Sequence, residues 1–181
     1  MYGLVNRAIE QMVVSLHGDG GWRQVCAHAG TEADGFVAMH AYDDAVTLRL
    51  VAAVSRQTGL APSAVLEAFG EYWILYTADS YGEVLQAAGS SLHEFLQNLN
   101  ELHGRLEPVF PGMKPPQFRV EDIAPGRYRL HYGSQRAGLA PMVLGLVRGL
   151  AQRFGQRVEV TLIHAKTRID EEDVFDLREL P

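Results

Sequence analysis

The sequence contains very little cysteine, and this alone removes several classes of protein. Cys26 is the single cysteine among the 181 residues. One thiol cannot form a disulfide within the chain, and it cannot supply the several thiolates of a zinc or iron–sulfur site. A single thiol is compatible with a reducing compartment, and we interpret Cys26 as a small core residue rather than as a redox sensor.

The chain also lacks an excess of positive charge and a long apolar run. Its formal net charge is -6 at pH 7, which argues against nucleic acid as a partner because phosphate binding depends on clustered Lys and Arg. No stretch approaches the roughly 18–20 apolar residues of a membrane span. The first seven residues do not resemble a signal peptide. We therefore expect a cytoplasmic protein that binds neither nucleic acid nor a membrane.

What the chain does have is the composition of one folded domain. Hydrophobic residues make up 47% of it and charged residues 21%, as in ordinary globular proteins. Apolar residues at helical spacing predict helices over residues 4–16, 44–58, 63–76, 91–106 and 139–154. The glycine run at 18–21 should end the first of these helices. Asp43 or Asp44 should cap the second, and Ser63 should cap the third.

The hydrophobic pattern changes to a two-residue period in the last third of the chain. This alternation is typical of strands, which we expect over residues 118–120, 128–132, 158–164 and 174–177. Pro125 and Gly126 should form the turn between the first two strands. The acidic run at 170–173 is interpreted as a solvated turn between the last two.

Helices followed by strands imply an α+β fold with an antiparallel sheet of about four strands. No internal repeat or linker divides the chain, so we expect a single domain over residues 1–181. Within it we expect a helical lobe over about 1–60 and a mixed lobe over about 61–181. The mixed lobe would contain the sheet and a long helix that ends near residue 106.

His103 is the most informative single residue. It follows Leu96 and Leu99 at helical spacing, so its imidazole should project from the apolar face of that long helix rather than into water. One interpretation is a core histidine that is hydrogen-bonded to a carbonyl group. The other is an axial ligand that reaches from a hydrophobic helix toward a haem iron.

A second candidate element is the stretch from Tyr132 to Arg136. At strand period Tyr132, Ser134 and Arg136 share one side, where they present a phenol, a hydroxyl and a guanidinium. These three donors suit a ligand that carries paired carboxylates, because Arg can bind a carboxylate with two hydrogen bonds. The alternative is a strand end followed by a polar turn.

Together these residues resemble the haem nitric oxide/oxygen-binding (H-NOX) family. That family has a proximal haem histidine on a long helix, a proline beyond it that packs on the porphyrin, and a Tyr-x-Ser-x-Arg motif that holds the propionates. The resemblance implies that His103 is the axial ligand and that Pro116 packs on the ring. It assigns the propionates to Tyr132, Ser134 and Arg136, and it spans essentially the whole chain.

The resemblance also implies a cofactor and a way to signal. Haem b would be bound non-covalently, because the chain has no Cys-x-x-Cys-His attachment sequence. Nitric oxide weakens the bond opposite itself, so the link between iron and His103 could break and release strain in the helix, to which Pro116 contributes. A partner that binds the strained and relaxed forms differently can read this change.

The distal side of the expected haem pocket lacks a phenol. Oxygen-binding members carry a distal tyrosine supported by a tryptophan and an asparagine. The resemblance places Ile9 at the tryptophan, Trp73 at the asparagine, and Pro141 or Met142 at the tyrosine; the residues expected to line this side are Val5, Ile9, Trp73, Pro141, Met142 and Leu146. An apolar pocket favours nitric oxide over oxygen, which needs a hydrogen-bond donor. Trp73 could supply one if it faced the iron, and the alternative is a core or interface role.

The predicted function is a bacterial-type gas sensor and not an enzyme. Ferrous haem would bind nitric oxide, and also carbon monoxide, and the chain would regulate a separate signalling protein. The family suggests a histidine kinase or a cyclic-di-GMP enzyme as that partner. The alternatives are an oxygen-binding haem sensor, a haem enzyme of the peroxidase type, which needs a distal general base, and a haem-free interaction module.

Overall fold

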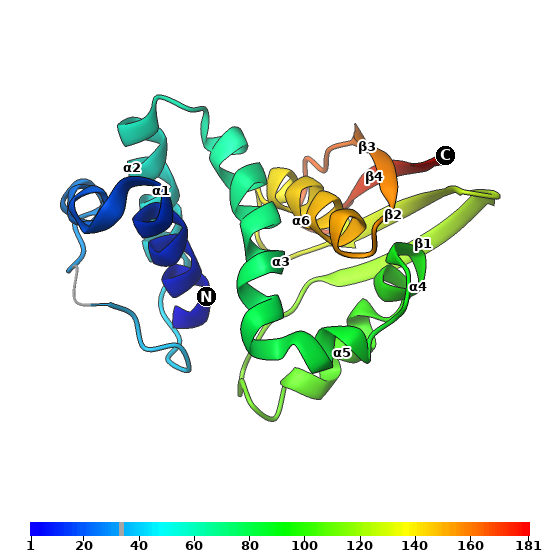
Figure 1. Ribbon diagram of the computed structural model, residues 1–181, viewed down its shortest axis with the longest axis horizontal. Coiled ribbons are helices and arrows are strands. Elements are labelled where there is room, and N and C mark those ends of the chain that lie inside the picture. The colour runs from blue at the N-terminus through cyan, green and yellow to red at the C-terminus, as the bar shows by residue number, and fades with distance from the viewer. Residues whose placement is uncertain (33–34) are drawn as a thin grey trace.

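A long central helix separates two groups of elements (Figure 1). The computed structural model describes residues 1–32 and 35–181. Helix α3 (Pro62–Gln86) has α1 (Gly3–Ala29) and α2 (Asp44–Thr58) on one side, and α6 (Ala140–Arg153) and the sheet on the other. Within the described residues, no helix combines the length and the hydrophobicity that crossing a bilayer requires.

The sheet confirms the predicted α+β fold. Its four strands are β1 (Gln117–Ala124), β2 (Arg127–Gly133), β3 (Arg157–His164) and β4 (Glu172–Leu180), in the order β1-β2-β4-β3. All neighbouring strands are antiparallel. Along β2 every second side chain is buried, namely Tyr128, Leu130 and Tyr132. One face of this strand therefore belongs to the core, as the two-residue period indicated.

The predicted long helix before residue 106 is wrong in one respect, because it is broken in two. Helix α4 (Leu92–Gln97) begins at its cap Ser91, whose hydroxyl accepts a hydrogen bond from the Glu94 amide, and α5 (Leu99–Leu106) carries His103. Asn98 lies between them outside the helical region, at φ -91° and ψ 1°. Its side-chain amide donates to the Ala88 carbonyl over 2.8 Å. Asn side chains compete with helical hydrogen bonds in this way, while the apolar spacing continues unbroken.

The glycine run at 18–21 interrupts the first helix but does not end it. Gly18 leaves the helical region at φ 67° and ψ -179°, and a second helical stretch then continues to Ala29. This stretch buries Trp22, Val25 and Cys26. Its own apolar face explains why the chain becomes helical again after the break.

Three further predictions concern the ends of helices and strands, and they have different outcomes. Asp43 caps α2 as predicted, by accepting a hydrogen bond from the Ala45 amide over 2.8 Å. Ser63 does not cap α3, which begins at Pro62 after Ala61, because proline is favoured in the first turn of a helix. The acidic run at 170–173 is only partly a turn, since Asp173 is a buried residue of β4.

Glycines allow α3 and α6 to pack unusually closely. A side-chain carbon added at Gly145 would lie 1.9 Å from the Glu67 carbonyl oxygen, and one added at Gly70 would lie 2.2 Å from the Met142 carbonyl oxygen. Only glycine permits this approach. The contact holds Trp73 on α3 and Leu146 on α6 in the wall of one cavity.

Cys26 should be unreactive in the folded protein. The residue is 1% exposed, and burial, together with the nearby Glu10 carboxylate, raises the pKa of its thiol to about 11. The thiolate is the reactive form, so iodoacetamide at pH 8 should label the native protein at least about a hundredfold more slowly than the protein in denaturant. Mass spectrometry of timed samples measures both rates. Equal rates would show that Cys26 is accessible.

Candidate functional site

A cavity of about 610 Å³ lies among the helices and the sheet. Its volume falls in the range of about 300–1,000 Å³ that holds cofactors and other small ligands. Most of its lining is apolar and comes from seven elements, represented by Val5 of α1, Trp73 of α3, Leu96 of α4, Leu99 of α5, Phe118 of β1, Leu130 of β2 and Leu146 of α6. Residues from nearly the whole length of the chain therefore enclose one space.

The structure brings together the five residues predicted to ligate and anchor a cofactor. His103, Pro116, Tyr132, Ser134 and Arg136 all line the cavity. His103 comes from α5, Pro116 from the segment just before β1, and the other three from the end of β2 and the loop that follows it. The apolar helix face and the strand motif thus meet in one site.

The residues expected on the distal side divide into two sets. Four of them line the cavity: Val5, Trp73, Met142 and Leu146. Ile9 is instead buried in the core at 1% exposure. Pro141 is not a lining residue, although its neighbour Met142 is. Of the two residues considered for the tyrosine position, the one that reaches the cavity is therefore Met142, an apolar thioether.

His103 is a half-buried residue whose ring nitrogen Nδ1 is itself buried. Among the residues that the structure describes, its Nδ1 has no hydrogen-bond partner. Burial lowers the pKa of His103 below its ordinary value, and the nearby Pro116 carbonyl opposes this shift only in part. The ring is therefore neutral at pH 7, which is the form that binds metals. A metal-ligating histidine commonly uses its second ring nitrogen to contact a backbone carbonyl, so the contact with the Pro116 carbonyl fits both interpretations of His103.

Arg136 lies at the rim of the cavity in a network of polar contacts. Its Nε donates to Asp44 Oδ2 over 2.7 Å, and one terminal nitrogen donates to the Lys114 carbonyl over 2.9 Å. Ser134 Oγ accepts a hydrogen bond from the Arg136 amide over 3.1 Å, which fixes the loop that carries the guanidinium. The N-terminal amino group of Met1 also contacts Asp44.

Asp44 is a carboxylate that faces two cations. Partial burial by itself favours the neutral acid, but hydrogen bonds from the N-terminal amino group and from Arg136 prevail and hold the pKa of Asp44 below its ordinary value. Asp44 is also the first residue of α2. The pair with Arg136 therefore ties the N-terminal helices directly to the rim of the cavity.

Two residues of this rim were missed from the sequence. Asp44 was considered only as a helix cap, yet it pairs with a residue 92 positions away. Lys166 donates through Nζ to the Ser134 carbonyl over 2.5 Å and lies 5.8 Å above the Tyr132 ring. Its amide donates to the buried Asp173 over 3.0 Å. No local sequence pattern predicts contacts between residues so far apart in the chain.

These residues fit a haem. A mostly apolar cavity with one neutral imidazole in its wall suits a planar hydrophobic cofactor whose iron needs an axial ligand. The rim offers the guanidinium of Arg136, the hydroxyl of Ser134 and the phenol of Tyr132, which suit the two carboxylates of that cofactor. Fold and site together define a domain that can hold a large apolar cofactor.

Comparison with known proteins gives the family. A family model described as Haem-NO-binding matches residues 2–162, and the chain therefore belongs to the haem-NO-binding, or H-NOX, family. It is a haem-binding gas-sensor domain related to soluble guanylate cyclases, and such domains are sensors rather than catalysts. The soluble guanylate cyclase gcy-35 of Caenorhabditis elegans is 32% identical over 161 residues, which are 85% of this chain and 23% of that protein. The chain spans about a quarter of the length of the curated relatives it matches.

Solved structures show the same fold. An H-NOX protein from S. oneidensis in the Fe(II)NO ligation state superposes with a TM-score of 0.89 at 18% identity, covering 100% of both chains. An oxygen-binding H-NOX domain related to soluble guanylate cyclases superposes with a TM-score of 0.84 at 21% identity, covering 100% of this chain and 96% of that one. The fold is therefore shared by a structure with nitric oxide and by an oxygen-binding domain.

Proposed function

We propose that this chain is a sensor of nitric oxide that holds haem b non-covalently through His103 and regulates a separate signalling protein. The observation that carries the proposal is the state of the His103 ring. The residue is half-buried in an apolar wall, its buried Nδ1 has no hydrogen-bond partner within residues 1–32 and 35–181, and burial holds its pKa below the ordinary value against the opposing contact with the Pro116 carbonyl. Haem, when bound, supplies the iron to which a diatomic gas coordinates.

Tyr132, Ser134 and Arg136 are proposed to hold the haem propionates. Arg136 has five donor N–H groups; Nε and one terminal nitrogen donate to Asp44 over 2.7 and 3.5 Å, and the other terminal nitrogen donates to the Lys114 carbonyl over 2.9 Å, so two N–H groups are left. Its side chain is 24% exposed, so a carboxylate at the rim can reach the guanidinium. Asp44 then keeps the guanidinium in place and connects it to α2.

The break at Asn98 offers a route for the signal. Helix α5 is only eight residues long, and Asn98 separates it from α4. His103 would hold the haem, and a gas that loosened this hold would let α5 shift as a short unit about Asn98. Pro116, which lines the same cavity, would pack against the haem. A histidine kinase, a cyclic-di-GMP enzyme or another catalytic partner that prefers one position of α5 would then respond.

The choice of nitric oxide over oxygen rests on the expected distal residues that line the cavity; Thr77 and Tyr81 of α3 line it too, and the Thr77 hydroxyl donates to the Trp73 carbonyl over 2.7 Å. Val5, Met142 and Leu146 offer no hydrogen to a bound gas, whereas oxygen needs a donor. Oxygen sensing is the second candidate function, because Trp73 lines the cavity and carries an indole N–H. The ring of Trp73 packs against Phe69 at 6.1 Å and Tyr76 at 6.2 Å between centroids, which favours a packing role for this side chain.

The direct test is an absorption spectrum of the purified protein before and after reduction, and again after nitric oxide is added. We expect an intense Soret band that shifts on each addition. A protein that carries no haem after reconstitution with hemin, and whose spectrum does not respond to nitric oxide, would contradict the proposal. It would instead support the haem-free interaction module.

Arg136→Ala should accelerate haem loss without removing the axial ligand. A charge-assisted hydrogen bond contributes about 1.5–3 kcal/mol, so the haem dissociation rate should rise roughly ten- to hundredfold. Transfer of haem to an apo-globin trap measures this rate.

Two controls accompany the Arg136 variant. Arg168→Ala removes an exposed guanidinium that pairs only locally with Asp170, and it should leave the rate unchanged. Asp44→Asn removes the partner of Arg136 but leaves the guanidinium, so its rate should stay well below that of Arg136→Ala. If Arg136→Ala and Arg168→Ala lose haem alike, the propionate assignment is wrong.

A further inference from the structure

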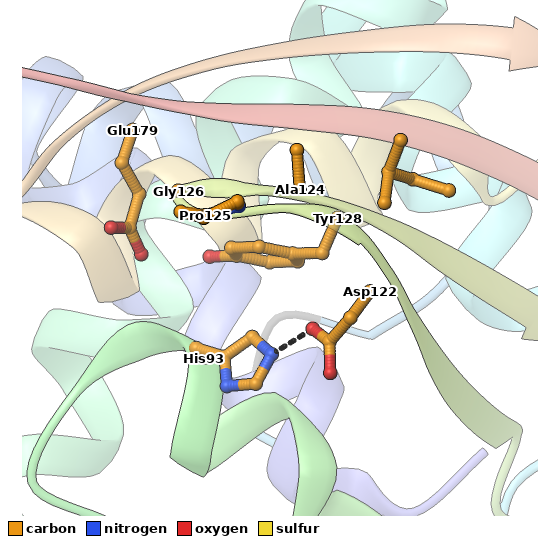
Figure 2. Close-up of a pocket in the computed structure, with 8 residues that line it drawn as sticks. His93, Asp122, Ala124, Pro125, Gly126, Tyr128 and Glu179 are labelled. Carbon is orange, nitrogen blue, oxygen red and sulfur yellow. Dashed lines mark hydrogen bonds and ion pairs between the residues drawn. The ribbon is translucent and has the colours of Figure 1, made fainter.

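A second pocket lies at the far end of the sheet, and it shares no lining residue with the large cavity (Figure 2). Its volume is about 570 Å³. It forms where α4, the turn between β1 and β2, and the end of β4 meet, and it is lined by His93, Asp122, Ile123, Ala124, Pro125, Gly126, Tyr128 and Glu179. The proposed haem site uses none of these residues.

Strand register places the polar side chains of this pocket on one face. Asp122 and Tyr128 are direct cross-strand partners on β1 and β2, and Tyr128 pairs in turn with Leu177 of β4. Glu179 follows Leu177 by two positions, so it faces the same way. The His93 ring of α4 packs edge-on against the Tyr128 ring, with 4.8 Å between centroids.

The Tyr128 hydroxyl is buried and has no partner. Tyr128 is 2% exposed, and among the described residues its hydroxyl makes no hydrogen bond. Figure 2 shows the hydroxyl end of the ring directed toward the side of the pocket where the Glu179 carboxylate lies. Leaving a buried polar group without a partner is unfavourable, and a ligand in this pocket that bonds the hydroxyl would recover that loss.

Negative charge surrounds this hydroxyl. Burial raises the pKa of Tyr128, and the carboxylates of Glu179 and Asp122 raise it further. Asp122 Oδ1 contacts His93 Nε2 at 2.6 Å, whereas Glu179 has no ion-pair partner within residues 1–32 and 35–181. None of the eight lining residues is Lys or Arg. The pocket therefore presents acceptors and negative charge.

We propose that this pocket binds a guanidinium or alkylammonium group. Such a cation donates to the Tyr128 oxygen and to the Glu179 carboxylate at once, and it neutralises the charge that the pocket leaves uncompensated. A guanidinium fits best because its planar fork can satisfy two acceptors and lie against the rings of Tyr128 and His93. Anions meet two carboxylates and are excluded.

The pocket is open enough to admit such a group from solution or from another protein. Asp122 is 67% exposed, and the turn residues Ala124, Pro125 and Gly126 are exposed. The cation can be a free small molecule or the arginine side chain of a partner. Both sources present the same cationic group, and a comparison of methylguanidinium with an arginine peptide distinguishes them. The proposal does not depend on what occupies the large cavity.

The test is a titration of the ¹⁵N-labelled protein, reduced and saturated with carbon monoxide, with methylguanidinium. Saturable shifts of the Gly126, Tyr128 and Glu179 amide resonances are expected. The neutral isostere N-methylurea should shift none of them. Equal shifts with both compounds, or none with either, would overturn the proposal.

Three variants localise the binding. Glu179→Gln should weaken methylguanidinium binding about tenfold, and Tyr128→Phe, which keeps the packed ring, should weaken it about three- to tenfold. The control is Glu159→Gln, an exposed glutamate of β3 outside the pocket, which should bind like the unchanged protein. Unaltered affinity in Glu179→Gln would overturn the proposal.

A peptide then identifies the source of the cation. If acetyl-Gly-Arg-Gly-amide binds at least about tenfold more tightly than methylguanidinium, the pocket recognises an arginine in a polypeptide, and the partner presents that side chain. If the two bind equally, the pocket recognises a free small cation. Both results support the cation site, whereas a peptide that fails to compete with bound methylguanidinium excludes a protein partner.

Discussion

Replacing His103 by glycine should remove nearly all the haem that the protein retains on purification, and added imidazole should restore it. The ring lies in an apolar wall of the cavity, with its Nδ1 unpaired. Glycine deletes the ring and leaves room for a free imidazole of the same size. We expect the ratio of Soret to protein absorbance to fall at least about tenfold, since the one bond from protein to iron is lost.

The control for this variant is His164→Gly. It removes an exposed imidazole of β3 that lies outside the cavity, so the haem content should not change. Circular dichroism establishes that the His103 variant is folded. If that variant is folded and keeps the haem content and spectrum of the unchanged protein, His103 is not the ligand.

The sequence predicted the parts of the site that depend on local spacing. The apolar face that presents His103 follows from its helical register with Leu96 and Leu99. The burial of Tyr132 follows from the two-residue period of β2, but the strand ends at Gly133, so Ser134 and Arg136 reach the site from the loop that follows and not by strand alternation. All five predicted ligating and anchoring residues line one cavity.

The sequence did not predict the parts that depend on a single polar contact between distant segments. The break between α4 and α5 coincides with Asn98, whose side-chain amide bonds the Ala88 carbonyl, and the apolar spacing across that position does not predict it. Asp173 is buried because the Lys166 amide meets its carboxylate, although its acidic neighbours are typical of a solvated turn. Ile9 has the right spacing for the cavity but packs in the core instead.

The choice between oxygen and nitric oxide depends on whether the indole N–H of Trp73 points toward the bound gas. Trp73 lines the cavity, and its N–H is the donor from the expected distal set that could stabilise bound oxygen. The remaining members that line the cavity, Val5, Met142 and Leu146, are apolar. A missing hydrogen bond to a polarised ligand costs on the order of 1–3 kcal/mol. Nitric oxide binds with little charge separation and loses less.

The ferrous protein in air should therefore form no long-lived oxygen complex, yet it should bind nitric oxide tightly. Absorption spectra recorded in air for an hour after the reductant is removed measure the lifetime of any oxygen complex. An anaerobic titration measures the affinity for nitric oxide. Trp73→Phe keeps the ring contacts with Phe69 and Tyr76 and deletes the N–H, so it should leave both results unchanged. A stable oxygen spectrum that disappears in Trp73→Phe would instead identify an oxygen sensor with Trp73 as the donor.

The same titration tests how the signal leaves the pocket. If His103 is released, the spectrum with nitric oxide should be mostly that of five-coordinate haem, and α5 becomes free to shift about Asn98. Asn98→Ala restores an uninterrupted helical sequence from Leu92 to Leu106 and removes the contact with the Ala88 carbonyl. Because alanine favours the helix, this variant should stiffen the connection and raise the six-coordinate fraction at least about threefold. A wholly six-coordinate spectrum in the unchanged protein would leave haem binding intact but refute release of His103 as the signal.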